Sequence, residues 1–165
     1  ISTSVYRDFC VEVFRSFERH GFEHIYIMNG HGANLDPLRD AGHTLKNASV
    51  RIKSWWDFSR VAELRSQFYG SWEGMHATPS EIAITQTKHR TLKTDLAKEP
   101  PEKLTSEFIK SHAGDKHGSA KEHKSQFPDG RVGSHSILAT PEHGTHLKQA
   151  AVDALCIDYQ AFLVS

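Results

Sequence analysis

Residues 25–34 have the sequence IYIMNGHGAN, a short apolar run that ends in two glycines around one histidine. The run is bounded by turn residues, which is typical of a buried β-strand. Gly30 and Gly32 should let the backbone turn tightly and keep side-chain bulk away from His31. A histidine between glycines can also be a plain turn residue, hydrogen-bonded to the backbone. Its place at the carboxyl end of a strand, where open α/β sheets carry their chemistry, favours a ligand or catalytic role.

The segments around this strand predict an α/β fold. A helix is expected over residues 3–20, ended by Gly21, because apolar residues recur every four positions. That stripe consists of Val5, Phe9, Val13 and Phe17, broadened by Phe14. A second helix is expected over 34–47 and a second strand over 50–55. This order favours a parallel strand pair with a right-handed crossover, and so a three-layer α/β/α architecture around a mostly parallel sheet.

The rest of the chain should be mostly helical. The expected helices are 59–69, 79–88, 102–111 and a last one from Pro141, capped by Thr140. Residues 112–136 are rich in His, Gly, Ser and Lys and predict a long surface loop. Residues 1–165 are expected to form a single domain.

Composition excludes several functional classes. Lys and Arg balance Asp and Glu at 20 each among 165 residues, which argues against a dedicated nucleic-acid or membrane-surface protein. No apolar run approaches the roughly 20 residues that cross a bilayer, and no signal peptide opens the chain. Cys10 and Cys156 are expected to be buried free thiols, which favours a reducing, cytoplasmic location. The chain starts directly in a helical pattern without methionine, so we expect it to be the interior of a longer protein.

A second motif, WEGMHATPSE, covers residues 72–81. His76 should lie in a loop just before a helix, and Glu81 in the first turn of that helix. Thr78 and Glu81 also form a good capping box, which explains both residues without any function. An aromatic residue beside a loop histidine more often packs than recognises a ligand, so Trp72 alone is weak evidence.

A third histidine-rich segment, EHGTH at residues 142–146, looks like a metal cluster. Its side chains three and four positions apart would share one face of a helix. The segment opens a surface helix, however, and Gly144 is poorly suited to a rigid site. We therefore favour a structural role, with Glu142 placed favourably at the helix N-terminus.

The first two motifs together resemble the creatininase (creatinine amidohydrolase) family. Residues 29–34, NGHGAN, resemble its Asn-Gly-His-Gly-Gly-Asn element. Residues 76–81, HATPSE, resemble its His-Ala-Gly-Glu-x-Glu-Thr-Ser element, with the histidine and the glutamate five positions later aligned. Trp72 falls where the enzyme that names the family carries a substrate-pocket tryptophan. Residues 133–144 resemble the usual lead into the last helix.

This resemblance implies a hydrolase that cleaves a C–N bond of a cyclic or linear amide through a metal-activated water. It implies two divalent metal ions, zinc, manganese or iron, a small amide substrate and a homo-oligomer. His31 would be a metal ligand, and His76 and Trp72 would be catalytic residues. Ala33 stands where the family's name-giving enzyme has a metal-binding glutamate, so Glu81 could supply the missing carboxylate.

One element of the family pattern is missing. The first metal motif, Glu-x-His-Gly-x-His with a downstream aspartate, does not occur, so the chain resembles the C-terminal two-thirds of a family member. The absence supports an alternative function, a catalytically inactive α/β module for binding or assembly. A nucleotide-binding domain is a weak third hypothesis, because no phosphate-binding loop is present.

Overall fold

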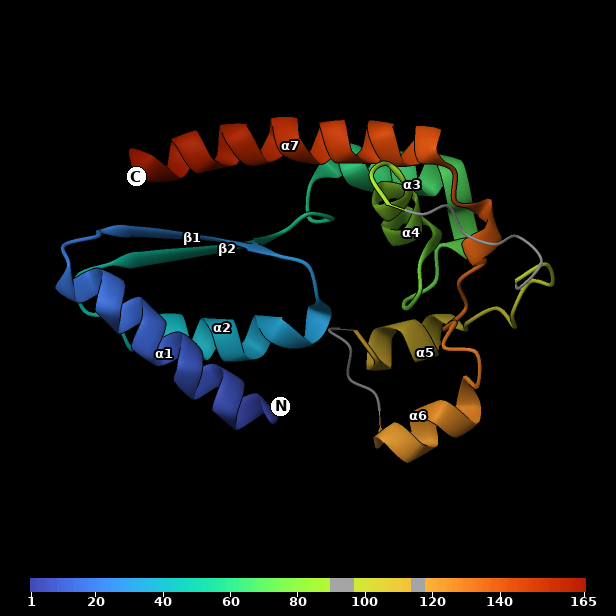
Figure 1. The fold of residues 1–165 in the computed structure, drawn as a ribbon, viewed down its shortest axis with the longest axis horizontal. Coiled ribbons are helices and arrows are strands. Elements are labelled where there is room, and N and C mark those ends of the chain that lie inside the picture. Colours follow the sequence, from blue (N-terminus) through green and yellow to red (C-terminus); the bar gives the residue numbers. More distant parts are fainter. Residues whose placement is uncertain (90–96, 114–117) are drawn as a thin grey trace. The chain divides into compact units, whose positions relative to one another are not determined.

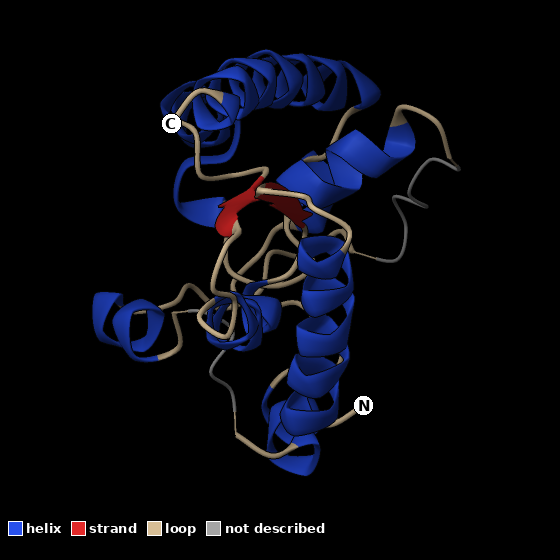
Figure 2. Ribbon diagram, turned by 90° about the vertical axis from the view of Figure 1, so that its left-hand side faces the viewer, coloured by secondary structure: helices blue, strands red, loops and turns tan. Residues whose placement is uncertain are grey.

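A computed structural model describes residues 1–89, 97–113 and 118–165. The chain divides into two compact units, one formed by residues 1–57 and 154–165, the other by residues 58–153. Figure 1 shows the order of the elements along the chain, and Figure 2 shows their classes. The single-domain expectation stays a prediction.

The first unit contains the expected strand, helix and strand. Its elements are α1 (Thr3–Arg19), β1 (His24–Asn29), a short 3-10 helix (Gly32–Asn34), α2 (Leu35–Gly42), β2 (Ser49–Ser54) and the end of α7 (Pro141–Leu163). The strands pair in parallel, with His24 opposite Ser49 and Asn29 opposite Ser54. The parallel pair confirms the expected α/β class. The second helix ends earlier than expected, at Gly42 instead of residue 47.

Helices cover both faces of this strand pair. The helices α1 and α2 lie on one face, and the last turns of α7 lie on the other (Figure 1). On the α7 side, the Tyr26 hydroxyl donates to the Asp158 carboxylate at 2.8 Å, and Arg51 lies 4.6 Å from the centre of the Phe162 ring. The unit is therefore a three-layer α/β/α arrangement.

The helix α1 packs with only part of the expected apolar face. Its end is as predicted, since Gly21 has φ +84° and its N–H donates to the carbonyl of Glu18. The residues that face the core are Cys10, Val11 and Phe14, whereas Phe9 is 65% exposed. Apolar residues lie on two sides of this helix. The buried side is the one that packs against Ile25 and Leu38. Of the expected stripe, Phe14 is buried and Val13 packs against the core, whereas Val5, Phe9 and Phe17 are exposed.

The second unit is helical among its described residues. Its elements are α3 (Ser59–Tyr69), a 3-10 helix (Gly70–Trp72), α4 (Pro79–Gln86), α5 (Ser106–Ser111), α6 (Ala120–Gln126), a 3-10 helix (Ser136–Leu138) and the start of α7. The Thr140 hydroxyl accepts the His143 N–H, so Thr140 caps α7 as predicted. The buried apolar residues of this second unit include Val61, Leu64, Ala83 and Leu147.

Two further sequence expectations are wrong. The helix α6 lies inside the segment expected to be loop, because Ser119 and Glu122 form a complete capping box that starts it; residues 114–117 of that segment lie outside the described residues. Cys156 is exposed, although Cys10 is buried as predicted and both thiols are free. Cys156 occupies a side of α7 that no described element covers.

Across the described residues, no helix combines the length and the apolar character that a bilayer crossing requires.

Candidate functional site

His31 follows β1 directly, at its carboxyl end, as the sequence predicts. It is exposed, and it begins the 3-10 helix that leads into α2. The buried side chain of Asn29 holds this turn. Its amide nitrogen donates to the His31 carbonyl at 2.9 Å and to the Ser54 hydroxyl at 3.0 Å, and its oxygen accepts the His31 N–H at 3.3 Å. Asn29 therefore joins the ends of both strands and fixes the backbone that carries His31.

The glycines around His31 do not act as expected. Neither Gly30 nor Gly32 has a positive φ, and a Cβ built on Gly30 would meet no atom within 4 Å. The turn is made by the Asn29 side chain instead of by glycine backbone freedom. Sequence analysis assigned no role to Asn29 beyond its place in the NGHGAN element, although an asparagine before a Gly-His pair is itself a turn signal.

His76 lies in the loop before α4, and its backbone is tightly held. It pairs with Val132 in an isolated antiparallel bridge: the Val132 N–H donates to the His76 carbonyl at 3.3 Å, and the Met75 N–H donates to the Val132 carbonyl at 2.9 Å. The Ser134 hydroxyl also donates to the His76 carbonyl, at 2.6 Å. The ring itself is exposed and lies 5.9 Å from the ring of His123, nearly perpendicular to it. A fixed backbone with a presented ring suits a proton-transferring histidine.

The backbone on either side of His76 adopts left-handed conformations. Gly74 has φ +65°, and a Cβ there would collide with the hydroxyl and backbone of Ser134. Ala77 has φ +53°, which is rare for a residue with a Cβ. The Ser136 hydroxyl holds Ala77 by donating to its carbonyl at 2.7 Å. Such conformations often occur at functional sites, where surrounding bonds maintain them.

Trp72 is half-buried next to this loop. Its carbonyl accepts the His135 N–H at 2.9 Å, and the two rings lie 5.6 Å apart. The Lys103 ammonium lies 4.4 Å from the centre of a Trp72 ring. Burial lowers the pKa of His135, and the nearby Arg131 charge lowers it further. The packing alternative for Trp72 is therefore realised, and a substrate contact stays a prediction.

Glu81 forms the capping box that the sequence predicts. One of its carboxylate oxygens, Oε2, accepts the Thr78 N–H at 3.2 Å and the Thr78 hydroxyl at 2.8 Å, while the Thr78 hydroxyl accepts the Glu81 N–H at 3.2 Å. The other oxygen, Oε1, takes no part in the cap. The capping role is present, and a metal-binding role for Glu81 stays a prediction.

A buried carboxylate that sequence reasoning passed over, Glu73, supports this loop. The Glu73 side chain is 12% exposed and pairs with the guanidinium of Arg65 at 2.9 Å. It also accepts a hydrogen bond from the Ser80 hydroxyl, which is itself 3.1 Å from the Thr78 hydroxyl. Burial raises the pKa of Glu73, while Arg65 and Ser80 act to lower it. These bonds tie the residues before His76 to α3 and to the start of α4.

The segment at 142–146 serves packing. The His143 ring stacks on Phe68, with ring centres 4.0 Å apart and planes 4° from parallel. Gly144 is buried, and a Cβ there would collide with the backbone carbonyl of Ala83 on α4. Gly144 therefore has a structural role, because the absence of a Cβ lets α7 pack closely against α4.

The predicted site residues fall in both compact units. His31 belongs to the first unit, and Trp72, His76 and Glu81 belong to the second. A shared pocket for His31 and His76 therefore stays a prediction. Within residues 1–89, 97–113 and 118–165, no three His, Cys, Asp or Glu side chains gather in a way that could hold a metal ion.

Comparison with known proteins now assigns the family. The family model of creatininase, described as creatinine amidohydrolase, matches residues 1–157. Because the match covers nearly the whole chain, the protein belongs to the creatininase family. No curated protein sequence matches it significantly.

Solved structures support the same fold. The chain resembles a crystal structure of creatinine amidohydrolase (creatininase), with a TM-score of 0.75 and 16% identity over 98% of this chain and 65% of that one. It also resembles a structure described as a tryptophan-to-phenylalanine mutant creatininase, Type II, with a TM-score of 0.70 and 17% identity over 96% of this chain and 65% of that one. The chain thus spans 65% of the length of these proteins, and at such low identity the likeness concerns the fold alone.

Proposed function

We propose that this chain contributes to a metal-dependent amidohydrolase of creatininase type, which hydrolyses a C–N bond in a cyclic or linear amide. The placement of His31 carries the proposal. This chain belongs to the family. Its exposed His31 follows the carboxyl end of the parallel strand β1, and the buried Asn29 side chain fixes the His31 backbone. This is the edge where parallel sheets bind ligands.

His76 and Trp72 would act on the amide substrate itself. Cleaving an amide requires a proton on the departing nitrogen, and a histidine with a fixed backbone and an exposed ring can donate it. Trp72 would form an apolar wall for the substrate. Glu73, through Arg65 and Ser80, would position the loop without touching the substrate.

The described residues do not by themselves form a complete metal centre. His31 would supply one ligand and Glu81, through its Oε1 atom, another. Metal dependence therefore rests on family membership and on these two side chains. Zinc, manganese and iron remain the expected ions.

Metal analysis of the purified chain tests the proposal against the inactive-module alternative. After loading with Zn²⁺ or Mn²⁺ and removal of free ions, we expect bound metal in the wild type and an affinity at least about tenfold weaker in His31→Ala. His43→Ala is the matched control, because His43 is exposed just beyond α2 and should not change metal binding. Wild-type protein that binds no metal and cleaves no amide, creatinine included, would favour the binding or assembly module.

Replacing Glu81 by glutamine separates its two possible roles. Glutamine still completes the capping box, so the free energy of unfolding should change by no more than about 0.5 kcal/mol. An amide is a far poorer metal ligand than a carboxylate, so metal affinity or turnover should fall by at least about tenfold. Calorimetric metal titration beside a urea unfolding curve measures both effects. Metal binding and turnover that match the wild type would leave Glu81 as a helix cap only.

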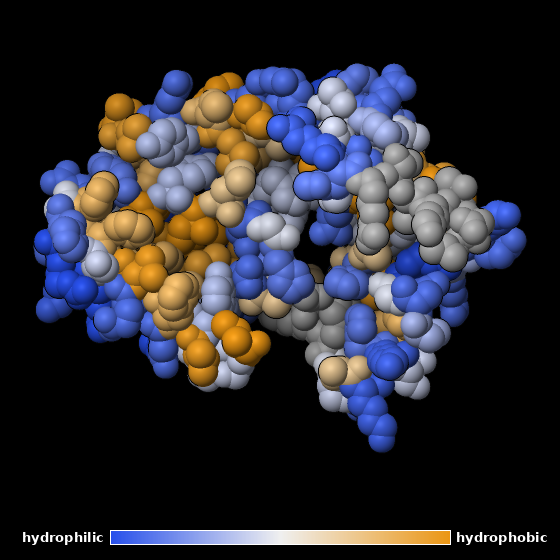
Figure 3. Space-filling model, in the orientation of Figure 1, coloured by the Kyte–Doolittle hydropathy of each residue, from blue (hydrophilic) through white to orange (hydrophobic). Residues whose placement is uncertain are grey.

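The other functional expectations stay predictions. They are a small amide substrate, a cytoplasmic location and self-association into a homo-oligomer. Exposed apolar side chains on and after α1 support self-association; they include Val5, Phe9, Phe17 and Phe22. Figure 3 shows apolar residues reaching the surface over this helix.

A further inference from the structure

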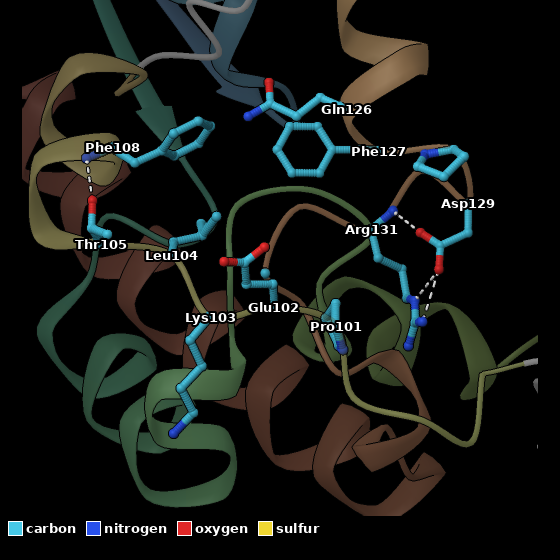
Figure 4. Close-up of a pocket in the computed structure, with 12 residues that line it drawn as sticks. Pro101, Glu102, Lys103, Leu104, Thr105, Phe108, Gln126, Phe127, Asp129 and Arg131 are labelled. Carbon is cyan, nitrogen blue, oxygen red and sulfur yellow. Dashed lines mark hydrogen bonds and ion pairs between the residues drawn. The ribbon is translucent and has the colours of Figure 1, made fainter.

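The second unit contains a cavity that the proposed reaction does not use. It has a volume of about 340 Å³ and lies between α5, α6 and the segments next to them (Figure 4). Its lining comes from residues 101–105, Phe108, residues 126–129, Arg131 and Gly133. Small-molecule sites usually measure about 300–1,000 Å³, so this cavity suits a small ligand.

Two phenylalanines form the aromatic wall of this cavity. The rings of Phe108 and Phe127 lie 6.0 Å apart at 76° to each other, and both side chains are half-buried. The ring of His112 stacks on Phe108 at 3.8 Å and so supports it from one side. Leu104 packs against Gly133, where a Cβ would collide with it. The lining therefore offers apolar and aromatic surface to the body of a ligand.

The two positive side chains that line this cavity, Lys103 and Arg131, already have partners. The Arg131 guanidinium binds the Asp129 carboxylate through two nitrogens, each at 2.8 Å, and donates to the Glu99 carbonyl at 2.9 Å. These bonds to Arg131 also hold the pKa of Asp129 below its usual value, so this pair stays ionised and neutral overall. Lys103 lies over Trp72 and in Figure 4 points away from the two phenylalanines.

One negative charge remains without compensation. Figure 4 shows the Glu102 carboxylate in the middle of the lining residues, between Leu104 and Arg131. Glu102 forms no hydrogen bond or ion pair with any residue that the structure describes. The amide of Gln126 lies at the rim of the same cavity, beside Phe127. The cavity thus joins a carboxylate and an amide to two aromatic rings, whose faces carry negative potential.

We propose that this cavity binds a small organic cation, an ammonium group attached to an apolar or aromatic body. The ammonium pairs with the Glu102 carboxylate, and the Gln126 carbonyl oxygen can accept one of its N–H bonds. The body packs against Phe108 and Phe127, where a cation near an aromatic face gains further attraction. None of these residues belongs to the amide-cleaving machinery proposed above, so this site goes beyond that function and does not depend on it.

The site is connected to the loop that carries His76. The ring centres of Phe127 and His123 lie 5.3 Å apart, and those of His123 and His76 lie 5.9 Å apart. Val132, between two lining residues, pairs with His76 through the backbone. A ligand in the cavity should therefore change the magnetic environment of the His76 ring without touching it.

Nuclear magnetic resonance titration of the full chain tests this proposal. The probe is 2-phenylethylammonium, compared with neutral 2-phenylethanol and anionic 3-phenylpropionate, which share its aromatic ring. We expect saturable shifts of the Phe108 and Phe127 ring signals, smaller shifts at His76, and affinity in the order cation, neutral, anion. Glu102→Gln should weaken cation binding about fivefold and leave 2-phenylethanol unchanged. The control Glu107→Gln, an exposed residue of α5 outside the lining, should bind all three as the wild type does.

Three results would overturn the proposal. They are equal affinity for the three probes, unchanged cation affinity in Glu102→Gln, and no saturation of the Phe108 and Phe127 shifts at millimolar probe. Glu102 is exposed, so its variant should fold, and a circular dichroism spectrum checks that directly. Binding is measured without turnover or metal, so a failure here is distinct from a failure of the amidohydrolase proposal.

Discussion

Replacing Gly144 by alanine is expected to lower the free energy of unfolding by about 3 kcal/mol or more. Gly144 is buried where α7 crosses α4, and an added Cβ would collide with the Ala83 carbonyl and approach the Ile84 nitrogen to 2.8 Å. These are backbone atoms, so no side-chain rotation relieves the collision. The helices must separate, and Leu147 and Ala83, both fully buried, would lose packing.

The sign of this effect makes the prediction sharp. In an exposed helix the same substitution stabilises by roughly 1 kcal/mol, because alanine has the higher helix propensity. Urea unfolding followed by circular dichroism measures the difference. The control Thr145→Ala lies one position along the same helix and is exposed, so it should stay within about 0.5 kcal/mol of the wild type. A Gly144→Ala variant as stable as the wild type would show that α7 and α4 do not approach this closely.

Local signals predicted much of the first unit correctly. The apolar run at residues 25–28, the cap at Gly21 and the alternation before Ser54 each depend on neighbours in sequence, so they could be recognised there. The exposed stripe of α1 shows the limit of such signals. Apolar residues line two sides of this helix, and only contact with Ile25 and Leu38 decides which side is buried.

The motifs in the sequence identified the candidate site residues but not the residues that hold them in place. His31, Trp72, His76 and Glu81 stand out by residue type and position. Asn29 and Glu73 do not stand out, because each supports the site through hydrogen bonds to residues that only the fold brings close. Asn29 reaches Ser54, 25 positions away, and Glu73 reaches Arg65 and Ser80 from two different helices. Long-range hydrogen bonds of this kind leave no periodic signal in a sequence.

Replacing His76 by asparagine in the metal-loaded protein is expected to lower amide turnover by about a hundredfold, the usual contribution of a general acid. Asparagine keeps the backbone bonds to Val132 and Ser134, so the loop should retain its shape. It removes the group that we propose protonates the departing nitrogen. His89→Asn is the control, since His89 is exposed beyond α4 and should not affect turnover.

The leaving group distinguishes proton donation by His76 from a role in substrate binding. An alkylamine leaves poorly without a proton, whereas a nitroanilide can depart as a stabilised anion. His76→Asn should therefore slow an alkylamide by about a hundredfold and an activated anilide far less. An equal loss on both substrates would assign His76 to holding the substrate. If the loss is the same in His89→Asn, then His76 has no specific part in the reaction.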